Sequence, residues 1–262
     1  MKIALAQLDM GFENKDLAKQ RCMELMEKAK QKCADLIVFP EMTLTGFTMQ
    51  PTIYGEQKKN SETVAYFQNA AKTYDMGIVF GVIFLENGQA KNHSIVLDKH
   101  GELLADYAKI HPFSYGAEAK HYVGGENIAY CETEGMTISP FVCYDLRFPE
   151  IFQVASKKSC CMTVIANWPK ARIAHWKILL QARAIETQSF MVGVNRSGKD
   201  ETLEYSGDSM LISPTGEILA HVTAQNELQV VEIDIQQAKQ YRQTFPLKTD
   251  RKERLYAKWL LN

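Results

Sequence analysis

One stretch near the middle of the chain constrains the fold more than any other. Residues 136–142 form an apolar run of the length of a buried strand, and the run stops at Cys143. Pro149 and Glu150 then suit the first turn of a helix, because proline has a helical φ and a carboxylate favours the positive end of the helix dipole. Cys143 is therefore expected on a sharp turn, where backbone N–H groups lack partners in either element.

A cysteine at such a turn has two interpretations. An exposed sulfur beside unpaired N–H groups suits a nucleophile with its own oxyanion site. Free cysteines are, however, among the most buried residues of proteins, so this segment alone favours a structural role for Cys143. Other segments of the chain are needed to distinguish the nucleophilic role from the structural one.

The charge of the chain is balanced. The 262 residues include 30 Lys and Arg against 31 Asp and Glu, and 46% of the residues are hydrophobic. Balanced charge gives no electrostatic basis for binding nucleic acid or an anionic membrane.

No apolar run approaches the ~20 residues of a membrane span, and the first residues read directly into a strand without a signal-peptide pattern. We expect one domain over residues 1–262.

The cysteines and histidines form no recognisable metal or cofactor motif. The six cysteines include no CxxC pair, and the chain has neither an HExxH pattern nor a GxxxxGK phosphate loop. These observations predict no metal and no cofactor. Reduced cysteines are typical of a cytoplasmic protein, which is the location we expect.

Short apolar segments alternate with amphipathic ones along the chain. The pattern predicts strands at residues 2–7, 36–39, 77–85, 90–97, 102–108, 128–132, 136–142, 161–166, 190–195, 210–213, 217–221 and 228–234, and helices at residues 14–34, 61–74, 149–157, 173–188 and 235–244. This alternation predicts an α/β fold with helices on the outer faces of the sheet, but it does not separate one wound sheet from two stacked sheets. The long loop 43–60 contains Phe47 and other aromatic residues, which favours a role as a site wall.

Two further strand ends carry charged residues. Glu41 follows the strand 36–39 directly after Pro40, and Lys109 follows the strand that ends at residue 108. Taken alone, Lys109 would be a solvated surface lysine. Together with Cys143, however, three strand ends carry Glu, Lys and Cys in that chain order.

These three segments, with the blocks 167–176, 181–188 and 205–209, resemble the nitrilase (carbon–nitrogen hydrolase) superfamily, whose signature is a Glu-Lys-Cys triad. The resemblance is closest to the ω-amidase branch and runs from Ile3 to about Tyr256. It implies a four-layer α-β-β-α sandwich and a homodimer made by packing two sandwiches together.

The resemblance also implies the role of each residue. Cys143 would form a thioester with the substrate, and Glu41, in a poorly hydrated pocket, would act as general base and acid. Lys109 would stabilise the oxyanion together with the backbone N–H of Tyr144. Glu118 corresponds to a second glutamate that orients Lys109 and holds the substrate nitrogen.

The implied substrates are small ω-amides of dicarboxylic acids, such as 2-oxoglutaramate and 2-oxosuccinamate. Tyr144, Trp168 and Phe113 are expected to line the pocket. Arg172 follows a strand end and would pair with the substrate carboxylate in a two-point contact. A surface position near a helix start is the alternative for Arg172.

Several alternative functions remain open. Within the superfamily, the chain could be a deaminated-glutathione amidase, an aliphatic amidase or an N-carbamoyl hydrolase. The alternative that is not an enzyme is a catalytically silent binding module. A Cys–His mechanism would need one of His93, His111, His121 or His175, none of which has a recognisable cysteine-protease context.

Two further expectations concern the buried charges and the C-terminal tail. Asp145, Arg147, Arg183 and Glu186 are charged residues within apolar segments, and buried charges need partners, so we predict an ion-pair network around the Cys143 turn. The tail, residues 246–262, carries apolar side chains too large to leave in water, and we expect it to dock on the body or on a partner subunit.

Overall fold

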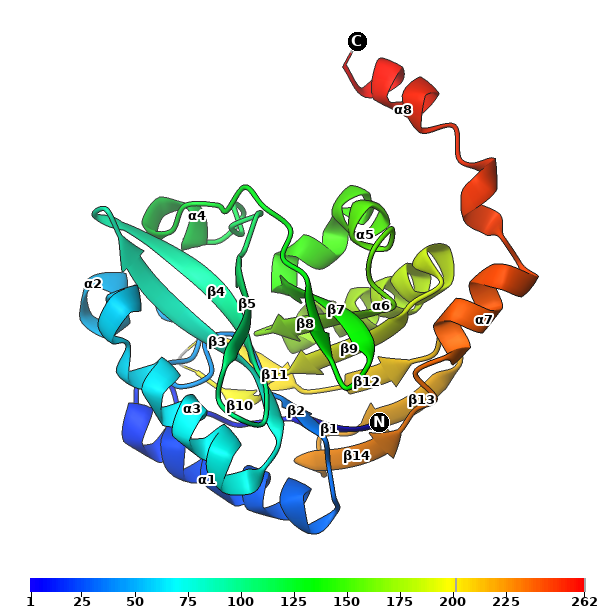
Figure 1. Ribbon diagram of the computed structural model, residues 1–262. Coiled ribbons are helices and arrows are strands. Elements are labelled where there is room, and N and C mark those ends of the chain that lie inside the picture. The colour runs from blue at the N-terminus through cyan, green and yellow to red at the C-terminus, as the bar shows by residue number, and fades with distance from the viewer. Residues whose placement is uncertain (201, 262) are drawn as a thin grey trace.

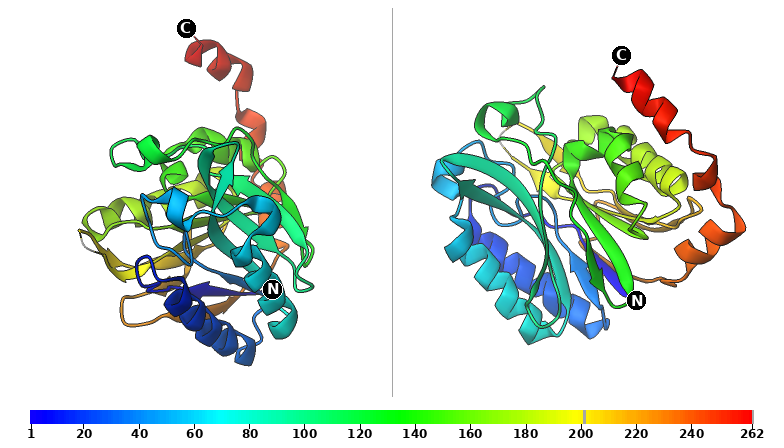
Figure 2. Two further views of the ribbon diagram at one scale, coloured as in Figure 1. Left: turned by 90° about the vertical axis from the view of Figure 1, so that its left-hand side faces the viewer. Right: turned by 45° about the horizontal axis from the view of Figure 1, so that its top comes forward.

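The computed structural model describes residues 1–200 and 202–261 (Figure 1). Its core consists of two six-stranded sheets that share a hydrophobic cluster, with helices on both outer faces (Figures 1 and 2). In spatial order, the first sheet contains β14 (Leu228–Glu232), β1 (Lys2–Ala6), β2 (Leu36–Val38), β3 (Gly77–Glu86), β4 (Gln89–Leu97) and β5 (Leu103–Ala108). The second contains β13 (Ile218–Val222), β12 (Ser209–Ile212), β9 (Phe190–Asn195), β8 (Cys161–Ala166), β7 (Met136–Val142) and β6 (Cys131–Thr133). The four-layer α-β-β-α sandwich is therefore confirmed.

Two helices cover each sheet. The first sheet is covered by α1 (Lys15–Gln31) and α3 (Glu62–Tyr74), and the second by α5 (Pro149–Ala155) and α6 (Ile173–Thr187). Asn14 caps α1, since its side chain accepts from the backbone N–H of Leu17 at 3.0 Å. The predicted end of this helix at residue 34 is wrong, because Cys33 has a φ of 56°, a left-handed conformation that ends a helix.

Alternating residues of β1 serve two different cores. Ile3 and Leu5 join the cluster between the two sheets, whereas Ala4 and Ala6 belong to the cluster beneath α1 and α3. Successive side chains of a strand point to opposite faces, and here both faces are buried. This explains why such strands read as continuous apolar runs rather than as alternating ones.

Parallel pairing places important strand ends at one edge. β7, β8 and β9 run parallel, with Val142 opposite Ile165 and Ala166 opposite Asn195. The residues that follow β7 and β8, Cys143 and Asn167, therefore lie at the same edge of the second sheet. β1, β2 and β3 are likewise parallel in the first sheet.

Several short elements were not predicted from the sequence. They are α2 (Pro51–Tyr54), α4 (Glu118–His121), the hairpin of β10 (Ser197–Lys199) and β11 (Glu204–Ser206), α8 (Glu253–Leu260), and the 3-10 turns at Lys58–Asn60, Cys143–Arg147, Lys170–Arg172 and Leu247–Asp250. Apart from α8, each has five residues or fewer, too few to give a periodic apolar pattern.

The C-terminal segment leaves the sandwich after α7 (Gln237–Thr244), and α8 projects away from the body (Figure 1). Arg242 donates to the carbonyl of Thr187, at the end of α6, and Lys248 donates to the carbonyl of Ser156, just after α5. The large side chain of Trp259 in α8 stays exposed. Docking of the whole predicted tail thus stays a prediction, and its last residue, 262, lies outside the described residues.

Within the described part of the chain, no helix combines the length and apolar character needed to cross a bilayer.

Candidate active site

Cys143 lies on the turn between β7 and α5, as predicted. Its φ of 47° is a left-handed conformation that residues other than glycine rarely adopt. The buried carboxylate of Asp145 holds this turn: it accepts from the backbone N–H of Val142 at 3.1 Å and from the hydroxyl of Tyr107 at 2.8 Å. The same carboxylate accepts from the backbone N–H of His111 at 3.1 Å. The turn therefore presents Cys143 from a rigid, hydrogen-bonded frame.

The predicted ion-pair network is present only in part. Arg183 pairs with Glu186 at 3.0 Å and donates to the carbonyl of Leu146 at 2.8 Å, so it connects α6 to the Cys143 turn. Asp145, in contrast, has no arginine partner among the described residues; besides the backbone and hydroxyl donors, Nδ1 of His111 lies 2.8 Å from its carboxylate. Arg147 points into the cavity above Cys143 instead.

Lys109 is enclosed in the interior, with 1% of its surface exposed. Its Nζ lies 2.9 Å from Oε1 of Glu41 and 2.8 Å from Oε2 of Glu118. Burial lowers the pKa of Lys109, but the carboxylates of Glu118 and Glu41 outweigh this effect and hold that pKa well above its usual range. Lys109 is therefore a buried cation, and not the solvated surface lysine that its position in the sequence alone would suggest.

Glu41 is fully buried and held from several sides. Its Oε1 also accepts from the side-chain amide of Asn92 at 2.7 Å, and its Oε2 accepts from the backbone N–H of Asn167 at 2.8 Å. A side chain at Gly81 of β3 would collide with the backbone nitrogen that follows Glu41, so the close approach requires glycine. These contacts fix Glu41 at the junction of the two sheets.

Glu118 lies at the start of α4 and is also fully buried. Besides Lys109, its carboxylate contacts the backbone N–H of Phe113 at 2.7 Å and the amide of Asn92 at 3.1 Å. The structure thus brings all four predicted catalytic residues into one cluster, in which Lys109 and the amide of Asn92 both bridge Glu41 and Glu118.

The thiol of Cys143 is coupled to this cluster. Burial and the negative charge of Glu41 raise the pKa of Cys143 well above its usual range, while Lys109 acts in the opposite direction. A polar interaction with the Glu41 side chain raises the pKa of Cys143 further. Cys143 is therefore a neutral thiol, and its activation requires transfer of the proton to a base.

A small cavity of about 50 Å³ opens over Cys143. All four predicted substrate-binding residues line it: Tyr144, Trp168, Phe113 and Arg172. The other lining residues are Phe47, Arg147, Asn167, Pro169, Leu203 and Tyr205. Phe47 confirms the expected contribution of the loop 43–60.

Two arginines face this cavity. The Arg172 guanidinium lies 5.6 Å from the ring centre of Phe113, and that of Arg147 lies 4.7 Å from the ring centre of Trp168. Among the described residues neither arginine is paired with a carboxylate; the polar neighbour of Arg147 is Nδ1 of His175, at 3.4 Å. Two cations without counter-ions beside a small apolar cavity favour an anionic group on the ligand.

Sequence reasoning missed Asn92, Arg147 and Tyr205 as parts of this site. Asn92 gave no signal in the sequence, because it lies among the polar residues Lys91, His93 and Ser94 of its strand. Arg147 was assigned to the ion-pair network, since its position on the turn gives no direction for its side chain. Tyr205 lies on the unpredicted hairpin, although the block 205–209 was part of the resemblance.

Comparisons with known proteins agree with this geometry. The chain matches the sequence model of the carbon–nitrogen hydrolase family over residues 2–243. It is 30% identical to the 2-oxoglutaramate amidase of Bacillus subtilis over 97% of this chain and 98% of that protein. It is 34% identical to the omega-amidase YafV of Escherichia coli over 84% of this chain and 85% of that protein.

A solved structure is also similar. It is XC1258 from Xanthomonas campestris, described as a CN-hydrolase superfamily protein with an arsenic adduct in the active site. The two chains align with a TM-score of 0.90 and 29% identity, over 96% of this chain and 97% of that one.

Replacing Lys109 with alanine should destabilise the fold far more than removing a surface lysine. The change leaves Glu41 and Glu118 buried without a cation, and breaking a buried pair in this way typically costs about 3–5 kcal/mol. Lys170 pairs with Glu204 at 2.8 Å, but on the surface, where such a pair contributes about 0–1 kcal/mol. Urea unfolding of Lys109→Ala and Lys170→Ala compares the two. Equal losses of stability would contradict the account of Lys109.

Proposed function

Because the chain belongs to the carbon–nitrogen hydrolase family, we propose that it hydrolyses small ω-amides of dicarboxylic acids, such as 2-oxoglutaramate and 2-oxosuccinamate, to the acid and ammonia. The family and its amidase relatives make it an amidase. The observation that most supports the proposed mechanism is the buried cluster beside Cys143, in which Nζ of Lys109 lies 2.9 Å from Glu41 and 2.8 Å from Glu118.

The first half of the reaction forms a thioester. Glu41 removes the proton of Cys143 as the sulfur attacks the carbonyl carbon of the amide, and the carbonyl oxygen becomes an oxyanion. Lys109 and the backbone N–H of Tyr144 stabilise that oxyanion. Glu41 then donates the proton to the amide nitrogen, the C–N bond breaks, and ammonia leaves.

The second half releases the acid. Glu41 removes a proton from water, which attacks the thioester carbonyl, and the same proton returns to the sulfur when the C–S bond breaks. Glu118 keeps Lys109 in place throughout, because both of its oxygens lie within 2.9 Å of Nζ. It also accepts a hydrogen bond from the amide nitrogen of the substrate.

The shape of the cavity supports a small substrate with a second, anionic end. An amide at the sulfur of Cys143 would place a carboxylate a few carbons away, toward Arg172 and Arg147, with Trp168 beside the methylene chain. Arg172 and Arg147, which pair with no carboxylate in the described part of the chain, favour it over a neutral aliphatic amide.

Cys143→Ala should abolish ammonia release, by at least about 10³-fold, because no other group can form the thioester. Circular dichroism and the unfolding midpoint should stay close to those of the wild type. Cys33→Ala is the matched control, since Cys33 is an exposed free thiol outside the site, and this variant should stay fully active. Substantial activity of Cys143→Ala would disprove the mechanism.

Arg172→Ala should raise KM for 2-oxosuccinamate about tenfold or more, since it removes a charge-assisted pairing with the carboxylate. The kcat should change little, and a neutral amide of equal length should be unaffected. The backbone contact at this residue survives, because the indole of Trp168 donates to the Arg172 carbonyl. Arg147→Ala tests the second arginine in the same assay.

Two results of the arginine assay would count against the proposal. If Arg172→Ala impairs both substrates equally, Arg172 is structural and the carboxylate is bound elsewhere. If the wild type prefers the neutral amide, the chain is an aliphatic amidase.

We further propose that this amidase is a cytoplasmic homodimer. All six cysteines are free thiols, which supports a reducing compartment. Val154 of α5 and both Ile178 and Ile185 of α6 are large apolar residues on the outer face of the second sheet, each about half exposed or more. Packing of two sandwiches through these helices would cover them.

Light scattering should therefore report twice the mass of the chain, and Ile178→Lys should shift the equilibrium toward the monomer, because it buries a charge in the interface. A monomer at all concentrations would contradict the dimer. Removal of residues 246–262 without any effect on mass or stability would contradict docking of the tail.

A further inference from the structure

A buried arginine follows β9 at the edge of the second sheet that carries Cys143. The side chain of Arg196 has no exposed surface, and its backbone N–H donates to the carbonyl of Ala166, the last residue of β8, at 3.1 Å. A guanidinium keeps its charge and has several donors, so its burial is costly unless partners surround it. The groups around Arg196 therefore show what its side chain does.

Arg196 connects the hairpin β10–β11 to the body of the protein. Its Nε donates to the carbonyl of Ser197 at 3.3 Å and its Nη2 to that of Lys199 at 3.4 Å, both in β10. The carboxylates of Asp200 and Asp9 lie 3.7 and 3.8 Å from its Nη1 and Nη2, beyond hydrogen-bonding distance. Nη1 makes no hydrogen bond in the described part of the chain. These contacts leave the charge of Arg196 only partly compensated.

The ring of Tyr205, in β11, completes the surroundings of this guanidinium. The ring centre lies 4.3 Å from the guanidinium carbon of Arg196, a distance at which a cation and an aromatic face attract each other. The Tyr205 hydroxyl donates to Asp200 at 2.9 Å, and the same carboxylate accepts from the backbone N–H of Leu203 at 2.9 Å. Tyr205 is therefore held both at its face and at its hydroxyl.

The ring held in this way forms part of the wall of the cavity over Cys143. Tyr205 and Leu203 line that cavity, whereas Asp200 does not. Burial and the charge of Asp200 raise the pKa of Tyr205, so the hydroxyl keeps its proton and continues to donate to Asp200. What Tyr205 presents to the cavity is therefore the apolar surface of its ring.

The position of β11 places this ring near the far end of the substrate. β11 lies beside the 3-10 turn Lys170–Arg172, and Lys170 of that turn pairs with Glu204 of β11 at 2.8 Å. Arg172, at the end of the same turn, is the residue proposed above to bind the substrate carboxylate. A longer chain between the amide and the carboxylate would therefore extend toward the Tyr205 ring.

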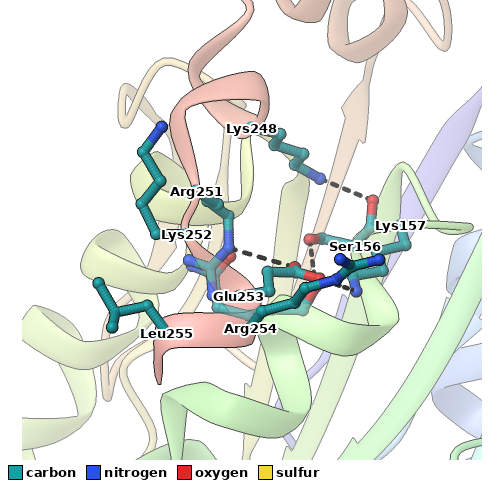
Figure 3. Close-up of a pocket in the computed structure, with 9 residues that line it drawn as sticks. Ser156, Lys157, Lys248, Arg251, Lys252, Glu253, Arg254 and Leu255 are labelled. Carbon is teal, nitrogen blue, oxygen red and sulfur yellow. Dashed lines mark hydrogen bonds and ion pairs between the residues drawn. The ribbon is translucent and has the colours of Figure 1, made fainter. Parts of the chain in front are cut away.

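The hairpin is not part of the surface that the proposed dimer covers. That surface includes α5, α6 and the C-terminal segment, and Figure 3 shows how the segment meets the end of α5: Lys157 pairs with Glu253 at 2.6 Å, and Lys248 donates to the carbonyl of Ser156 at 2.7 Å. The cavity between them shares no lining residue with the cavity over Cys143. The contacts of Arg196 therefore do not depend on the assembly.

We propose that Tyr205 limits the chain length of the amide substrate, and that Arg196 is a positioning residue that holds the Tyr205 ring in the cavity wall. This role rests on the function proposed above, since it assumes a substrate carboxylate near Arg172. Short ω-amides fit between Cys143 and the ring, whereas longer ones meet the ring before their carboxylate reaches the arginines.

Steady-state kinetics with the monoamides of succinic, glutaric and adipic acid, which lengthen by one methylene at each step, test the role of Tyr205. Tyr205→Ala should raise the ratio of kcat/KM for adipamate to that for succinamate about tenfold or more, because one methylene in an apolar pocket changes kcat/KM by about 10–200-fold. Tyr205→Phe keeps the ring and should keep the wild-type ratio. An unchanged ratio in Tyr205→Ala would overturn the proposal.

The same ratio tests the role of Arg196. Arg196→Met should shift it in the direction of Tyr205→Ala, and Arg196→Lys, which retains the charge, should shift it less in that direction. The double variant Arg196→Met/Tyr205→Ala should match Tyr205→Ala, because Arg196 has no ring left to position. Circular dichroism shows whether Arg196→Met folds; if it does not, Arg196→Lys decides.

Lys199→Ala is the matched control, since it removes an exposed cation of β10 and leaves the backbone carbonyl that accepts from Arg196. Its ratio should equal that of the wild type. If both Arg196 variants lower kcat/KM for all three amides by one common factor, Arg196 only stabilises the fold, and its positioning role is wrong.

The neutral amides butanamide and hexanamide separate this inference from the proposed function. If the wild type hydrolyses only the neutral amides, the proposed ω-amidase activity is wrong. The effect of Tyr205→Ala on the ratio of kcat/KM for hexanamide to that for butanamide then still decides the role of Tyr205. A ratio that stays at the wild-type value would show that the ring does not limit chain length.

Discussion

The ammonium group of Lys109 lies between the carboxylates of Glu41 and Glu118, and the site depends on this contact. Neither carboxylate would be stable in the interior without a cation, because unpaired buried charges are costly. The two carboxylates outnumber the one ammonium group, so the cluster retains negative charge beside Cys143. Burial and the charge of Glu41 raise the pKa of Cys143 and so keep the proton on the sulfur, and the same geometry places Glu41 where it can accept that proton.

The sandwich explains why these groups meet. Glu41 and Lys109 follow strands of the first sheet, whereas Cys143 follows a strand of the second, so no single sheet holds the cluster. The backbone N–H of Asn167, at the end of β8, donates to Glu41 and connects the two layers. Stacking of the sheets is therefore a condition for the chemistry, and disturbance of the interface between them should affect activity before it affects secondary structure.

Much of this arrangement is readable from the sequence. The apolar runs predicted the strands, and the strand that ends at Cys143 predicted its turn, because a buried strand followed by Pro149 leaves few other geometries. The stacking of two sheets came from the family resemblance alone, since alternation does not fix the number of sheets. Asn92 and Arg147 were missed for a physical reason: side-chain direction within the site depends on contacts between distant segments, which local patterns do not encode.

The protonation state of Cys143 tests the central claim most directly. The thiolate absorbs ultraviolet light, so the difference in absorbance between the wild type and Cys143→Ala, followed against pH, reports its ionisation. The account predicts no thiolate at neutral pH in the wild type, and ionisation at a lower pH in Glu41→Gln, where Lys109 acts with less opposition. A wild-type thiolate already present at neutral pH, with no change in Glu41→Gln, would contradict it.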